Sequence, residues 1–179
     1  RSSAASDVYK RQYIMGAGDL VYENLKSIGV NIELIDIDGI ENDDLDRFDT
    51  IIMGIRAFNI HNDLKSKNVL LFDYAKRGGN LLIQYNTTRN LLTSKLTPFY
   101  LNLSRDRVTE EDSTVKILNP LDRALNFPHK ITSKDFENWV QERGLYFPNK
   151  WDKNFIPMLS MNDKNEEEKL GSLLIGNHG

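Results

Sequence analysis

The chain has 179 residues, no cysteine and a formal net charge of −3, from 23 lysine and arginine residues against 26 aspartate and glutamate residues. This length suits one domain with a sizeable core, and no apolar run approaches the length of a membrane span. A chain without a strong basic field is a poor candidate for nucleic-acid binding. The lack of cysteine excludes disulfides, thiolate metal sites and thiol nucleophiles.

The two ends of the chain differ from the rest. Residues 7–12 are what the transposon-end adapter of a sequencing library encodes when it is read in frame, so residues 1–12 are predicted to be an artefact. The natural start is then expected upstream of Tyr13. At the other end, a strand-like run at 173–175 leads into a turn-like sequence at 176–179, so truncation is expected there too.

The first half predicts alternating strands and helices. A helix is expected after Asp19, a good N-cap, and it should end at Gly29. A second helix is expected from about Asp63 or Ser66 to Arg77, and an acidic segment at 41–49 predicts a short helix or turn. Short apolar runs predict strands at 13–15, 50–55 and 80–86, and alternating polar and apolar residues at 31–37 predict a strand nearer the edge of the sheet. Helical crossovers make such strands parallel, so we expect a doubly wound, mostly parallel α/β sheet with helices on both faces.

The pattern loosens from Asn90 onward, where all five prolines lie. Strands are expected at 115–118 and 155–159, and the sequence 132–135 predicts a capping box that begins a helix. The polar run 162–169 is typical of a solvated loop. The second half is therefore predicted to be loop-rich and partly β.

Three of the apolar runs stop at clusters of polar and glycine residues. In an open α/β sheet the ligand crevice lies outside the carboxyl ends of the strands, so these clusters predict a binding site at one edge. The candidate ligand-binding residues there are Asp19, Arg56, Asn59, Tyr85, Asn86, Thr87 and Arg89.

The second half adds charged residues that lie near aromatic residues in the sequence. Its candidates are Arg105, Arg107, Glu142 and Arg143. Arginine forks beside aromatic faces suit a sugar or another oxygen-rich small ligand. The alternative interpretation is that these arginines tie the long loops to the sheet.

Neither a phosphate loop nor a metal site is expected. The two glycines at 16–18 lack a third small residue at Val21, and Asp19 would repel a phosphate. The three histidines, His61, His129 and His178, are scattered without ligand spacing and are interpreted as surface or capping residues. No cofactor is expected in this chain.

Five segments taken in order carry a family resemblance: 13–19, 54–59, 78–87, 104–109 and 139–148. Together they resemble the C-terminal, class I glutamine amidotransferase-like (flavodoxin-like) domain of large PIG-L (LmbE-like) deacetylases, over nearly everything from Tyr13 to Gly179. The resemblance implies that 13–179 form this domain. It also implies a partner, a zinc-dependent N-acetyl-sugar deacetylase module that the sequence does not contain, with zinc only in that module, and an extracytoplasmic or periplasmic location.

Active amidotransferases place a cysteine on a sharp turn after a strand of the 81–85 type. Here Asn86 or Thr87 stands in that region, and threonine without an evident base is a poor nucleophile. No catalytic residue is assigned, and the expected function is a non-catalytic accessory or ligand-binding domain. Two alternatives stay open. One is an independent hydrolase that uses Asp19, Glu142 or an arginine-polarised site, and the other is an interaction module that docks through its second half.

Overall fold

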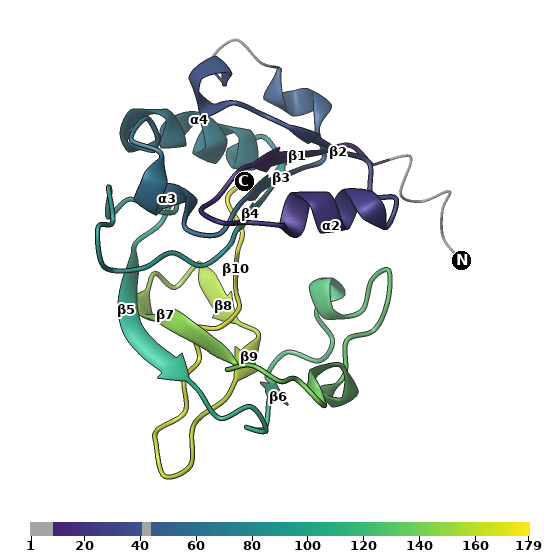
Figure 1. Cartoon of the computed structure of the whole chain (residues 1–179), viewed down its shortest axis with the longest axis vertical. Helices are drawn as coiled ribbons and strands as arrows, with labels where there is room; N and C mark the ends of the chain where they lie inside the picture. The colour runs from purple at the N-terminus through teal and green to yellow at the C-terminus, as the bar shows by residue number, and fades with distance from the viewer. Residues whose placement is uncertain (1–8, 41–43) are drawn as a thin grey trace. The chain divides into compact units, whose positions relative to one another are not determined.

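The computed structural model describes residues 9–40 and 44–179. The chain forms two compact units (Figure 1). Unit 1 runs to Pro98 and also includes His178 and Gly179, and unit 2 comprises Phe99–Asn177.

Unit 1 is built on a four-stranded parallel sheet with the strand order β2-β1-β3-β4. Its strands are β1 (Arg11–Ile14), β2 (Ile32–Leu34), β3 (Thr50–Met53) and β4 (Asn80–Ile83). The predicted parallel α/β arrangement of four strands is confirmed. β1 includes Arg11 and Gln12 from the adapter-like segment, and Gln12 is 1% exposed.

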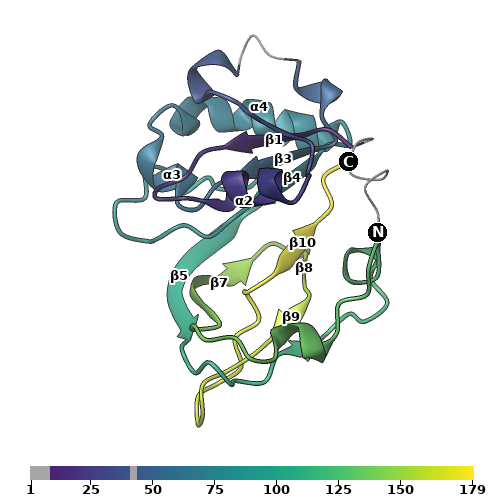
Figure 2. The same cartoon turned by 45° about the vertical axis from the view of Figure 1, so that its right-hand side comes forward.

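The helices of unit 1 are α2 (Val21–Ser27), α3 (Ala57–Ile60) and α4 (Leu64–Lys76), with short 3₁₀ turns at Ile37–Gly39 and Leu45–Arg47. The two predicted helices are confirmed as α2 and α4, and α3 was not predicted. Figures 1 and 2 show α2 and α4 on different sides of the sheet. In the predicted acidic segment, residues 41–43 lie outside the described part of the chain.

The packing of α2 follows from its apolar spacing. Val21 and Leu25 pack against a cluster of buried sheet residues that includes Tyr13 and Ile52. The helix stops before Gly29, whose φ of 85° is in the left-handed region that glycine tolerates. The predicted N-cap is displaced by one residue, because Leu20 occupies the cap position.

Unit 2 contains three pairs of antiparallel strands. Their bounds are Leu101–Val108 (β5) with Gly144–Trp151 (β7), Lys116–Ile117 (β6) with Leu159–Ser160 (β9), and Phe155–Pro157 (β8) with Leu174–Gly176 (β10). Two 3₁₀ turns, Arg123–Leu125 and Ser133–Phe136, lie in the long connection between β6 and β7. The loop-rich, partly β second half is confirmed.

The structure differs from the sequence prediction at two places in unit 2. The longest strand pair, β5 with β7, was not predicted, and its pairing contains three register shifts that break the alternation of apolar and polar residues. The helix predicted after the capping box is a single 3₁₀ turn that ends at Phe136, so Trp139 and Val140 lie beyond it. The core of this unit gathers buried side chains such as Val108, Phe147 and Met158.

Candidate functional site

The Asp19 side chain connects several loops at the carboxyl edge of the unit 1 sheet. It is 4% exposed, and its carboxylate accepts hydrogen bonds from the hydroxyl of Tyr13, the backbone N–H of Val21 at 2.9 Å and the backbone N–H of Ile55 at 3.1 Å. A side chain at Gly54 would collide with this carboxylate. Asp19 therefore joins β1, the start of α2 and the loop after β3, and its acceptor capacity is directed into the protein.

The hydroxyl of Tyr13 extends this junction to the loop after β4. It accepts a hydrogen bond from the side-chain amide of Gln84 at 2.8 Å while donating to Asp19. Burial and the hydrogen bond to Asp19 raise the pKa of Tyr13 above its ordinary value of 10. The hydroxyl thus stays protonated at neutral pH and serves as a fixed donor to Asp19.

Asn86, in the loop after β4, is 3% exposed. Its side-chain oxygen accepts from the backbone N–H of Phe58 at 3.0 Å, and its amide nitrogen donates to the carbonyl of Gln84 at 3.0 Å. Both ends of the amide are therefore occupied by backbone groups, and the side chain holds the first turn of α3 against the loop after β4.

Asn59 and Thr87 form a second link between the same two loops. The Asn59 amide nitrogen donates to the carbonyls of Thr87 at 2.9 Å and Arg89 at 3.1 Å, and its oxygen accepts from the backbone N–H of Thr87 at 3.0 Å. The Thr87 hydroxyl donates to the Arg89 carbonyl at 3.0 Å. This hydroxyl is already used as a donor, and within the described residues it makes no hydrogen bond to a basic side chain.

Three further candidates of unit 1 contribute no side-chain bond to this junction. Arg56 lies at a φ of 58°, and its backbone N–H donates to the carbonyl of Tyr85 at 2.8 Å. The side chains of Tyr85 and Arg89 are exposed. Within the described residues, no hydrogen bond or ion pair connects the side chains of Arg56, Tyr85 and Arg89. The structure thus brings the unit 1 candidates to one edge, as predicted, but ties four of them into the fold.

His61, interpreted from sequence as a surface or capping residue, also belongs to this junction. Its Nε2 lies 2.6 Å from the carbonyl oxygen of Met15. That contact connects the residue after α3 to the loop after β1. The carboxyl edge is therefore a network of loop-to-loop hydrogen bonds made largely by side chains to backbone groups.

In unit 2, Arg107 connects β5 to the polar loop 162–169. Its Nη1 lies 3.2 Å from the carboxylate of Asp163 and 3.4 Å from that of Glu166. Asp163 is 6% exposed and also accepts from the backbone N–H groups of Thr109 and Glu110 and from the Thr109 hydroxyl. Burial opposes ionisation of Asp163, but these donors together hold its pKa below the ordinary value.

Arg143 clamps two segments of unit 2 together. Its Nε donates to the carbonyl of Ser113 at 2.9 Å, and its Nη1 donates to the carbonyl of Phe136 at 2.7 Å. The guanidinium carbon lies 5.7 Å from the centroid of the Trp139 ring. Arg107 and Arg143 thus connect segments of unit 2, whereas the side chains of Arg105 and Glu142 are exposed and make no hydrogen bond or ion pair among the described residues.

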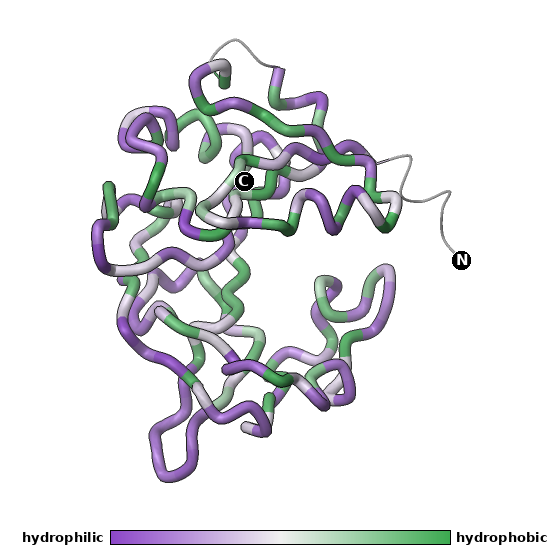
Figure 3. Tube along the Cα trace, viewed as in Figure 1, coloured by the Kyte–Doolittle hydropathy of each residue, from purple (hydrophilic) through white to green (hydrophobic). Residues whose placement is uncertain are grey.

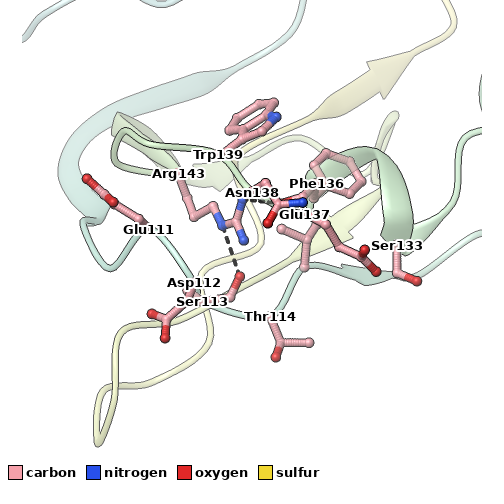
Figure 4. A pocket seen from close by; sticks show the side chains of 11 residues that line it. Glu111, Asp112, Ser113, Thr114, Ser133, Phe136, Glu137, Asn138, Trp139 and Arg143 are labelled. Atoms are coloured by element: carbon pink, nitrogen blue, oxygen red, sulfur yellow. Dashed lines mark hydrogen bonds between the residues drawn. The ribbon is translucent and has the colours of Figure 1, made fainter.

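A pocket of about 500 Å³ surrounds the Arg143 clamp (Figure 4). It is lined by the segment 111–115, by residues of 133–139 and by Arg143 itself. Sequence reasoning had singled out Arg143 and Trp139 but missed Glu111, Asp112 and Glu137. The capping box at 132–135 was the one local signal near this pocket, and nothing in the pattern of 111–115 indicated that this segment lies opposite it.

Within residues 9–40 and 44–179, no group of three or more histidine, aspartate or glutamate side chains is arranged to hold a metal ion. The same residues contain no helix with the length and apolar character that a bilayer crossing requires. Comparison with known proteins finds no match to a family model, to a curated protein or to a solved structure.

Proposed function

We propose that this chain is a non-catalytic, ligand-binding accessory domain of a PIG-L-type, zinc-dependent N-acetyl-sugar deacetylase. Its partner is the deacetylase module of the same protein, and its ligand is a sugar or another oxygen-rich small molecule. In this proposal unit 1 is a doubly wound, flavodoxin-like sheet, which the order β2-β1-β3-β4 and the placement of α2 and α4 support. The location, by the same resemblance, is extracytoplasmic.

The observation that carries the proposal is the bonding of Asn86. Nucleophilic catalysis at the end of β4 needs an exposed, activated group, but Asn86 is 3% exposed and is bonded at both ends of its amide. Thr87 next to it directs its hydroxyl to a backbone carbonyl. The sequence contains no cysteine. Neither Asn86 nor Thr87 is therefore placed to act as a nucleophile at this edge of the sheet.

The independent-hydrolase alternative is weaker for the same reason. A general acid or base has to reach a substrate proton, whereas the Asp19 carboxylate accepts three hydrogen bonds from within the protein. Glu142 is exposed and has no hydrogen-bond or ion-pair partner among the described residues.

Turnover assays test the proposal directly. The purified chain would be incubated with glutamine and, separately, with N-acetylglucosamine oligosaccharides, with and without zinc, while glutamate and acetate are measured. We expect saturable sugar binding but no release of either product. Release of glutamate or acetate at a rate that scales with protein concentration would contradict the proposal.

A further inference from the structure

We propose that the pocket beside Trp139 in unit 2 binds an amino sugar, a saccharide that carries a protonated amine. The sugar class rests on the proposed function, whereas the amine follows from the charges that border the pocket. The pocket belongs to unit 2, and one of the candidate residues of the sequence, Arg143, lines it.

Hydrogen bonds within the protein connect the segments that line the pocket. Arg143 donates to the carbonyls of Ser113 and Phe136, which stand on its two walls, and Figure 4 shows its guanidinium between them. Ser113 is itself buried, and its hydroxyl donates to the carbonyl of Asn162 at 2.6 Å. A hollow of about 500 Å³ whose lining segments are already bonded to each other spares a ligand the cost of ordering loops.

The second wall is fixed by its own turn. The Asp135 carboxylate accepts from the backbone N–H of Thr132 at 2.6 Å and from its hydroxyl at 3.1 Å. The first of these bonds is the main reason why the pKa of Asp135 lies below its ordinary value. Asp135 is therefore occupied as a cap, and its charge is not among those offered to the pocket.

Trp139 provides an aromatic surface at the pocket. The residue is 45% exposed, and its ring packs edge-on against Phe136 with the centroids 5.9 Å apart. The Arg143 guanidinium carbon also lies 5.7 Å from the centroid of this ring, and the exposed remainder of the ring keeps an apolar surface in water. The C–H face of a sugar ring is apolar while its rim carries hydroxyls, so it suits such a surface with polar groups around it.

The charges around the pocket favour a cation. Glu111, Asp112 and Glu137 line it and are exposed, and none of the three carboxylates has a hydrogen-bond or ion-pair partner among the described residues. The one cationic side chain in the lining is Arg143, and its guanidinium already faces two carbonyls and the Trp139 ring. A protonated amine would be attracted to these carboxylates by its charge, whereas a neutral acetamide carries no charge and would lack this attraction.

The charges of the pocket indicate which compound of a deacetylation reaction it would bind. Hydrolysis of an N-acetyl group on a sugar releases acetate and leaves an amine that is protonated near neutral pH. The pocket is thus matched to the product of a deacetylase more closely than to its neutral substrate. Binding of this product would keep partly deacetylated saccharide beside the enzyme to which the domain belongs.

Calorimetric titration of the whole 179-residue chain with two matched probes tests the inference. The probes are a glucosamine tetrasaccharide and an N-acetylglucosamine tetrasaccharide, at about pH 6 and low salt. We expect the amine form to bind about tenfold more tightly, since exposed ion pairs each contribute modestly. The Asp112→Asn/Glu137→Gln double variant should abolish this preference, and Trp139→Ala should weaken both probes.

Glu167→Gln is the matched control, because Glu167 is an exposed carboxylate of the loop 162–169 and not of the pocket lining. It should leave both affinities unchanged. Asp112 and Glu137 are exposed, so their neutral isosteres are not expected to affect folding. Equal affinity for both probes, absence of binding, or a preference that survives the double variant would overturn the inference. Equal binding without turnover would leave the accessory role standing, whereas turnover would contradict that role whatever the pocket binds.

Discussion

In unit 1 the Asp19 carboxylate is buried and accepts three hydrogen bonds, whereas in unit 2 the carboxylates of Asp112 and Glu137 are exposed beside a cavity. The two described regions contain the same kinds of polar group. The Asp19 carboxylate faces N–H and O–H groups of the protein, whereas the side chains of Asp112 and Glu137 have no hydrogen-bond or ion-pair partner among the described residues. A cluster of polar residues at strand ends therefore marks a structural junction as readily as a ligand site, and burial together with bonding distinguishes the two.

The largest effect is expected at Asp19 in unit 1. Asp19→Ala leaves the Tyr13 hydroxyl and two backbone N–H groups without their acceptor, so it should lower the free energy of unfolding by about 3 kcal/mol. Urea unfolding followed by far-UV circular dichroism measures this, because α2 and α4 belong to unit 1. Glu142→Ala, at an exposed carboxylate, should change stability by less than about 0.5 kcal/mol. Equal small effects of the two variants would show that Asp19 is not structural.

Asn86→Ala should cost about 2 kcal/mol, because it leaves the Phe58 N–H and the Gln84 carbonyl without their partner. The same unfolding experiment measures the loss. Asn62→Ala is a suitable control, since Asn62 is exposed and lies in the same unit. If Asn86→Ala proved as stable as Asn62→Ala, the residue would be free to serve a ligand.

The stability of unit 1 should depend on pH in the alkaline range through the buried hydroxyl of Tyr74. Tyr74 is 1% exposed and donates to the carbonyl of Phe48 at 2.9 Å, and burial raises its pKa to about 12 from an ordinary value of 10. In the unfolded chain the phenol ionises near pH 10, so the folded state retains the proton longer. Its stabilising contribution is complete below about pH 10 and is lost as the pH rises towards 12.

We expect this loss to be about 1 to 2 kcal/mol. Tyr74→Phe should remove this part of the alkaline destabilisation, which urea unfolding at pH 9 and at pH 11.5 would measure. An identical decline in the wild type and the variant would show that the hydroxyl is not protected by burial.

The smallest effect on stability is expected at the clamp of the unit 2 pocket. Arg143→Met removes two hydrogen bonds to carbonyls but keeps much of the side-chain packing, so unit 2 should lose about 1 kcal/mol. Tryptophan fluorescence reports on this unit, because both tryptophans, Trp139 and Trp151, lie in it. Arg105→Met, at an exposed arginine, should have no measurable effect. A loss at Arg105 as large as that at Arg143 would argue against the clamp.

The sheet of unit 1 could be predicted because its strands are largely short apolar segments, and because the segments between them carry apolar residues at the spacing of a helix. The partners of Asn59 and Asn86 could not, since both residues bond to backbone groups whose positions depend on the fold. β5 and β7 escaped prediction because three register shifts disrupt their alternation. The pocket could not be predicted because Arg143 bonds to the backbone carbonyl of Ser113, thirty residues away in the sequence. Every residue has such a carbonyl, so the type of residue at position 113 does not reveal this bond.

The central claim is that ligand binding belongs to the pocket of unit 2 and not to the carboxyl edge of the unit 1 sheet. An NMR titration of the full chain with the glucosamine tetrasaccharide, followed through amide and indole N–H signals, tests it most directly. We predict shifts at Ser113, Glu137 and the Trp139 indole, with the signals of Asn59, Asn86 and Thr87 unchanged. Shifts confined to Asn59, Asn86 and Thr87 would contradict the account.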